Sequence, residues 1–244
     1  MSAVAKASAK VGSGNYDNRS FAVQVSGSAD KTSPVPYFLL AFKVSIEEDD
    51  HWLNKLAVWG TSSSASNSKK DDTEGSQYRG KISHVEILIN HEDEKWYRYS
   101  IMKKTGQRRK DGSILWQWGK VHAIATKPDS VKNYRFYRIN SSFEGVNKAL
   151  SFLEEQVNNG SQFNFSGYVL NFIFPFKIGN NNYLQAVKKK RNNWFCTELV
   201  ICALQAGGVW HMQMRKACAV SPNELYRLVT EEHLGDHVYS HIAL

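Results

Sequence analysis

The segment that most constrains the fold is an apolar helix that begins near a cysteine. Residues 194–205 predict this helix, with Cys196 in its first turn and Gly207-Gly208 at its end. Asn193 is the expected N-cap, which would place Cys196 near the third helical position. Free backbone amides, the helix dipole and the preceding cationic run Lys188–Arg191 would all favour a thiolate there. The sequence therefore predicts an activated thiol.

The alternative interpretation of Cys196 is a buried structural cysteine. It shares a helix face with the apolar residues Leu199, Val200, Ala203 and Leu204. Cysteines in such a pattern are usually part of the core. Cys202 and Cys218 have none of the activating features, and we expect them to be inert. Three cysteines cannot all pair with one another and their spacing fits no zinc site, so we expect a reducing, intracellular environment.

A predicted strand at residues 82–90 carries a histidine and a carboxylate. Alternation places Ser83, Val85, Ile87 and Ile89 on one face and Ile82, His84, Glu86 and Leu88 on the other. The second face is typical of a partly covered cleft, although a solvated pair is the alternative. We expect His84 to accept the Cys196 proton and return it to a leaving group, and Glu86 to orient the imidazolium. Tyr97, Tyr99, Ser100 and His91 are the other candidates for that orienting role.

The rest of the chain predicts an α+β domain with polar extensions. Further strands are expected at 37–45, 95–102, 121–125 and 134–139, and further helices at 50–59, at 143–158 and after the N-cap Ser221. Residues 1–34 form a polar N-terminal arm, residues 35–230 the domain with a Ser-rich insertion loop at 61–77, and residues 231–244 a C-terminal tail. The chain begins without a hydrophobic signal core, and the longest apolar run, Tyr168 to Phe176, is too short to span a bilayer.

The net charge of +8 can be assigned to one stretch of the chain. Residues 102–140 contain ten Lys and Arg against two Asp, all the cations lying from Lys103 to Arg138. A solvated face is the simpler explanation, and contact with an acidic partner is the alternative. His237 and His241 have metal-ligand spacing if they are helical, but no third ligand is evident. We expect no metal and no cofactor.

Four segments in this order resemble the permuted papain-like cysteine amidases related to NlpC-type cell-wall hydrolases. The segments are Ser83-His84-Val85-Glu86-Ile87, Phe163 to Tyr168, Trp194 to Val200, and Ser221 to Tyr226. The branch that they resemble occurs in bacteria and in large eukaryotic DNA viruses. The resemblance implies a circularly permuted papain-like fold, in which an antiparallel sheet packs against the helix that carries the cysteine. It also implies Cys196 as nucleophile and His84 as base, with a variable third polar residue.

The resemblance implies a cysteine hydrolase or acyltransferase. Its substrate would be an acyl compound or a peptide, attacked at an amide, thioester or ester through an acyl-enzyme. The alternative is a virion-associated minor capsid protein of a large DNA virus that uses the fold as a scaffold. In that case the arm and the stretch Lys103–Arg138 would contact capsid proteins or another acidic partner, and the virion would be the location.

Overall fold

A six-stranded antiparallel sheet forms the centre of the computed structural model, which describes residues 35–45, 81–90, 95–101, 104–108, 114–127, 133–172, 191–209, 212, 216–232 and 234–241. Its strands are β1 (Tyr37–Val44), β2 (Ile82–Asn90), β3 (Trp96–Ile101), β6 (Val121–Thr126), β7 (Tyr134–Asn140) and β10 (Asp236–His241). They lie in the order β10-β7-β1-β2-β3-β6. With helices packed against this sheet, the expected α+β architecture is confirmed.

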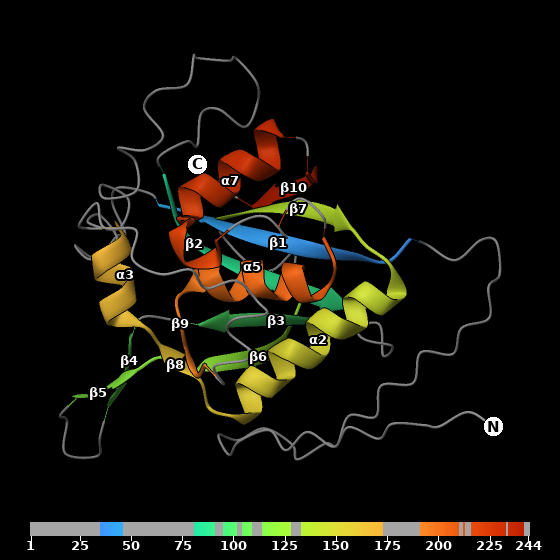
Figure 1. Cartoon of the computed structure of the whole chain (residues 1–244). Helices are drawn as coiled ribbons and strands as arrows, with labels where there is room; N and C mark the ends of the chain where they lie inside the picture. Colours follow the sequence, from blue (N-terminus) through green and yellow to red (C-terminus); the bar gives the residue numbers. More distant parts are fainter. Residues whose placement is uncertain are drawn as a thin grey trace, which may run out of the picture.

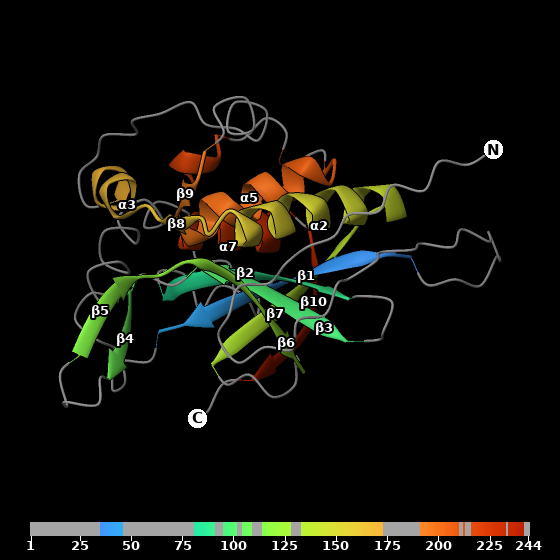
Figure 2. The same cartoon turned by 90° about the horizontal axis from the view of Figure 1, so that it is seen from below.

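Helices cover one face of the sheet. They are α2 (Phe143–Asn158), α3 (Phe165–Phe172), α5 (Cys196–Ala206) and α7 (Pro222–Glu231), with a 3-10 turn, η3 (Ala217–Ala219). Figure 2 shows these four helices as a layer above the sheet. Two short ribbons, β4–β5 (Lys104–Arg108 and Ile114–Trp118) and β8–β9 (Gln162–Phe163 and Asn193–Trp194), lie beside this body (Figure 1). No helix among the described residues is long and apolar enough to cross a membrane.

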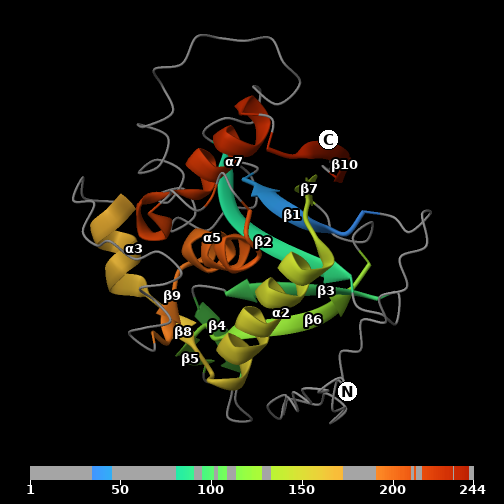
Figure 3. The ribbon, with the colours of Figure 1, turned by 45° about the vertical axis from the view of Figure 1, so that its right-hand side comes forward.

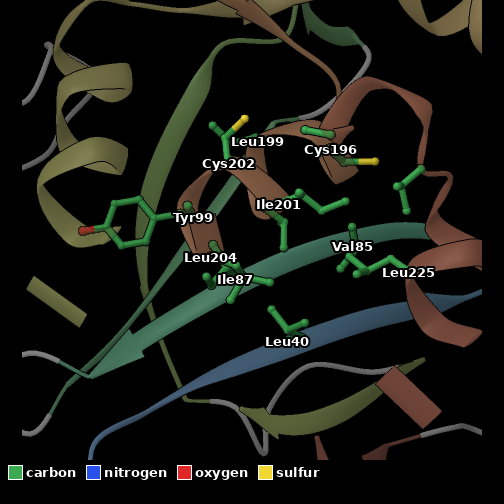
Figure 4. Close-up of a cluster of buried hydrophobic side chains, with 14 of the residues drawn as sticks. Leu40, Val85, Ile87, Tyr99, Cys196, Leu199, Ile201, Cys202, Leu204 and Leu225 are labelled. Carbon is green, nitrogen blue, oxygen red and sulfur yellow. The ribbon is translucent and has the colours of Figure 1, made fainter. Parts of the chain in front are cut away.

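Strand β2 is central because both of its faces are buried. Val85 and Ile87 face the helices, where they lie against Ile201 and Leu204 of α5 (Figure 4). Leu88 belongs instead to a smaller apolar cluster on the opposite face. Burial on both sides explains why this strand is almost continuously apolar from residue 85 to residue 89.

A β-bulge at Ser83 interrupts the pairing of β2 with β1. Lys43 pairs with His84 but Val44 pairs with Ile82, so that Ser83 is the extra residue. The insertion turns Ile82 into the core beneath the helices. Strict alternation predicts that Ile82 shares a face with His84 and Glu86, and the bulge makes this prediction wrong.

Helix α5 is buried along its whole length, including all eleven residues from Cys196 to Ala206. It lies over β2 between α2 and α7 (Figure 3). At its C-terminal end, a Cβ built on Gly145 of α2 would lie 2.4 Å from the Gly207 carbonyl oxygen. A side chain at Gly145 would therefore force the two helices apart. The positive φ of 72° at Gly208 ends the helix where the Gly-Gly pair predicts.

Most predicted elements that fall within the described residues lie within two residues of their expected bounds. Helix α7 begins as predicted, with the Ser221 Oγ accepting a hydrogen bond from the Glu224 N–H at 3.1 Å. The expected C-terminal tail differs, because Asp236–His241 form the edge strand β10. The predicted helix at 50–59, the arm at 1–34 and the loop at 61–77 lie outside the described residues.

Replacing Asn223 with alanine tests the link between α7 and β2. The buried Asn223 Oδ1 accepts a hydrogen bond from the Ile82 N–H at 2.9 Å. Its loss leaves that N–H unpaired in the core, so we expect the free energy of unfolding to fall by about 1–3 kcal/mol in urea denaturation. Asn158→Ala, at the exposed end of α2, is the control and should change it by less than about 0.5 kcal/mol. Equal losses in both variants would contradict the prediction.

Candidate functional site

Cys196 is the first residue of α5, and Phe195 is the N-cap. The prediction of Asn193 as N-cap is wrong, because Asn193 pairs with Gln162 in the β8–β9 ribbon. Phe195 has no side-chain oxygen to cap the helix. Glu198, at the third helical position, accepts a hydrogen bond from the Phe195 N–H instead, which is half of a capping box. Cys196 therefore lies at the helix terminus, nearer to the free amides than expected.

The strands β2 and β3 separate where Cys196 approaches the sheet. Their pairing runs from Asn90–Trp96 to Ile87–Tyr99 and ends there, although both strands continue. From Glu86 towards Ile82, β2 is therefore not paired with β3. In this part of β2, the Val85 N–H donates a hydrogen bond to the Cys196 sulfur. The hydroxyl of Thr197 lies 3.8 Å from the same sulfur.

The structure brings His84 of β2 beside Cys196 at the start of α5, and their side chains share a hydrogen bond. Burial alone would raise the pKa of the Cys196 thiol, but the charge of His84 and a hydrogen bond to its ring hold that pKa below its usual value. Burial would likewise lower the pKa of His84, but Cys196 and Glu86 together raise it to about 9. These opposite shifts favour a thiolate beside an imidazolium near neutral pH.

The Nε2 atom of His84 contacts two side-chain oxygen atoms. Ser100 Oγ lies 3.1 Å from it and Glu86 Oε1 lies 3.3 Å from it. Because both contacts use Nε2, Nδ1 remains for the hydrogen bond with Cys196. His84 keeps 17% of its side chain exposed, whereas Glu86 keeps 3%. The Glu86 carboxylate is thus almost fully buried, whereas the His84 ring is partly accessible.

Arg98 and Tyr134 both interact with Glu86, although no sequence pattern assigns either of them to the site. Arg98 Nε lies 3.3 Å from Glu86 Oε2, and the Tyr134 hydroxyl donates a hydrogen bond to the same carboxylate. Burial would raise the pKa of Glu86, but hydrogen bonding and charge from His84, then Arg98, keep it below its usual value. Tyr134 pairs with Lys43, which pairs with His84, so only the register across three strands places Tyr134 there.

The other candidates for the orienting role separate into two groups. Ser100 lies at the site, where it contacts His84. Tyr99 points to the opposite face, into the core beneath the helices, and burial raises the pKa of its hydroxyl, helped by Glu154 of α2. Tyr97 also packs against that core, and His91 lies outside the described residues.

The described cations of the basic stretch Lys103–Arg138 lie on several strands or at their ends. Arg135 on β7 is buried, with its Nη2 3.2 Å from His237 Nε2. Arg138 on the same strand lies 4.2 Å above the ring of Tyr37. At least these two cations therefore have structural partners, and Lys188–Lys190 lie outside the described residues.

Cys202 and Cys218 are both buried. Burial, followed by the charge of Glu198, raises the pKa of Cys202 well above its usual value. His237 and His241 lie on a strand, so that helical metal-ligand spacing does not apply to them. In the described part of the chain, no group of three His, Cys, Asp or Glu side chains is arranged to hold a metal ion.

The arrangement combines a thiol, an imidazole and a buried carboxylate that contacts the imidazole. A thiolate at a helix terminus beside a hydrogen-bonded imidazole can attack a carbonyl carbon and transfer a proton. The chain matches no protein-family model, no curated protein and no solved structure.

Glu86→Gln tests whether the carboxylate tunes His84. Glu86 raises the pKa of His84, so its neutralisation should lower that pKa and leave the thiolate with a weaker cation partner. We expect alkylation of Cys196 at pH 7 to slow by roughly tenfold, the effect of about one pKa unit. The pH profile of iodoacetamide labelling measures this.

The matched control is Glu154→Gln, which neutralises a half-buried acid that acts on Tyr99 rather than His84. It should leave the labelling profile unchanged. If Glu86→Gln also leaves the profile unchanged, the orienting role belongs to Ser100 or to no residue.

Proposed function

We propose that the protein is a cysteine hydrolase or acyltransferase with a circularly permuted papain-like fold. The observation that carries this proposal is the coupled pair of Cys196 and His84 at the start of α5, with Glu86 behind the imidazole. The chain order supports the permutation, since the histidine strand precedes the cysteine helix. The substrate class that fits this chemistry is an amide, a thioester or an ester.

In the first half of the reaction, the Cys196 thiolate attacks the substrate carbonyl carbon. The carbonyl electron pair moves to oxygen, where the backbone N–H groups of the first turn of α5 are suitable donors because they have no partner within the helix. The tetrahedral intermediate collapses as the His84 imidazolium gives its proton to the leaving amine, thiol or alcohol. A thioester on Cys196 remains.

In the second half, His84 acts as a base. It takes a proton from water, or from an acceptor nucleophile, as the oxygen or nitrogen attacks the thioester. Collapse expels the thiolate, which is again stabilised by the imidazolium, and releases an acid or a transferred acyl group. Glu86 keeps the imidazolium oriented throughout and does not itself need to gain a proton.

A structural role for the same fold is the second candidate, because Cys196 is only 5% exposed. A thiol that substrate cannot reach would serve packing alone. Under this alternative the chain would be a scaffold, such as a virion-associated protein, and the coupled site would be unused. The two functions differ in the reactivity of one sulfur atom.

Labelling with iodoacetamide, resolved by peptide mass spectrometry, decides between them. If the site is active, Cys196 should react at least tenfold faster than Cys202 and Cys218 at pH 7, because its pKa is lowered and that of Cys202 is raised. His84→Ala should remove this advantage. A p-nitrophenyl acyl ester should also leave an acyl group on Cys196. Equal, slow labelling of all three cysteines would refute the enzyme and favour the scaffold.

A further inference from the structure

A second buried ion pair lies at the start of α5, apart from the His84–Glu86 contact. Both guanidinium NH2 groups of Arg191 donate hydrogen bonds to the carboxylate of Glu198, with Nη2 2.9 Å from Oε2. Glu198 is fully buried and Arg191 is 12% exposed. Burial raises the pKa of Glu198 to about 7, against the opposing effect of Arg191. This pair has no assigned part in the proposed chemistry.

The same two side chains contact each of the three residues before the cysteine. Arg191 Nε donates to the Asn193 carbonyl oxygen at 2.8 Å, and the guanidinium lies 5.1 Å from the centre of the Trp194 ring. Glu198 accepts a hydrogen bond from the N–H of Phe195. The pair thus closes a loop from residue 191 to residue 198, with Cys196 inside it.

Stability alone does not explain an ion pair in this position. Replacement of a buried pair by apolar side chains is often neutral or stabilising, because desolvation offsets the attraction between the charges. Leu199, Ile201 and Cys202 of the same helix belong to the apolar core, which could accept such a replacement. A bidentate pair does, however, fix direction and distance better than an apolar contact.

We infer that Arg191 and Glu198 are positioning residues that hold the first turn of α5 so that the Cys196 sulfur meets His84. This inference rests on the proposed function, since it assigns the pair to the same thiol. Neither residue touches the reacting atoms. They act through the backbone of Phe195. The Phe195 N–H donates a hydrogen bond to Glu198, and the Phe195 carbonyl oxygen accepts one from the Leu199 N–H at 3.0 Å.

Positioning and simple electrostatics predict opposite effects at Glu198. If the carboxylate acted only as a nearby negative charge, its removal would favour the thiolate and accelerate alkylation. If it holds the turn, its removal displaces the sulfur from His84 and slows alkylation. The sign of the change in Glu198→Ala therefore separates the two explanations.

The experiment measures the pH profile of Cys196 alkylation by iodoacetamide in full-length variants. Glu198→Ala and Arg191→Met should each slow labelling at pH 7 at least tenfold and move the midpoint towards about 8.5, the value of an ordinary thiol. Glu198→Gln keeps an acceptor for Phe195 and Arg191 and should stay within about threefold of the native rate. Arg191→Lys keeps the charge but not the paired donors and should lie between these limits.

Leu204→Ala controls for a general loss of stability, because it opens a cavity at the other end of the same helix. It should lower the melting temperature yet leave the midpoint of the Cys196 profile unchanged. If Glu198→Ala does not fold, the alkylation profiles of Arg191→Lys and Glu198→Gln are compared with that of the native protein instead. Equal profiles in these two variants and the native protein would then overturn the inference.

Failure of this inference and failure of the proposed function give different results. If native Cys196 is no more reactive than Cys202, and His84→Ala has no effect, the proposed function fails and the positioning role with it. If native Cys196 is selectively reactive but Glu198→Ala labels as fast as the native protein or faster, only the positioning role is overturned.

Discussion

The candidate site depends on the seating of α5 against β2. Because every residue of α5 is buried, the helix cannot shift along the sheet without opening cavities on several sides at once. The close approach of Gly145 to Gly207 fixes the far end of the helix against α2. The position of Cys196 is therefore a consequence of core packing, refined by the polar contacts around the first turn.

Those polar contacts have to balance charge inside a region of low dielectric. Around the thiol, Cys196 and Glu86 supply negative charge, while His84 and Arg98 supply positive charge. Each charge lies next to an opposite one, which is the only arrangement in which burial does not neutralise them. Tyr134 adds a hydrogen bond to Glu86 without adding charge, because its own pKa is raised by burial.

Sequence patterns predicted the elements that repeat regularly and missed those set by pairing between distant segments. Alternation predicted β2, and helical spacing with a Gly-Gly stop predicted α5, so the meeting of His84 with Cys196 could be expected. The bulge at Ser83 could not, since one inserted residue leaves no local signal. Asn193 was assigned a cap because the two-residue pairing of β9 with β8 is invisible in sequence. The short polar strand β10 likewise shows little alternation of apolar and polar residues.

The partners of Glu86 could not be predicted from the sequence. Glu86 itself could be proposed as a partner of His84, because residues two apart on a strand point to the same side. Tyr134 reaches the site only through the register of β7 on β1 and of β1 on β2, and Arg98 through the register of β3. Apolar pairs such as Leu39 opposite Leu88 help to set these registers. The charge balance of the site is thus determined by core packing, so substitutions in these apolar pairs should act on the chemistry as well as on stability.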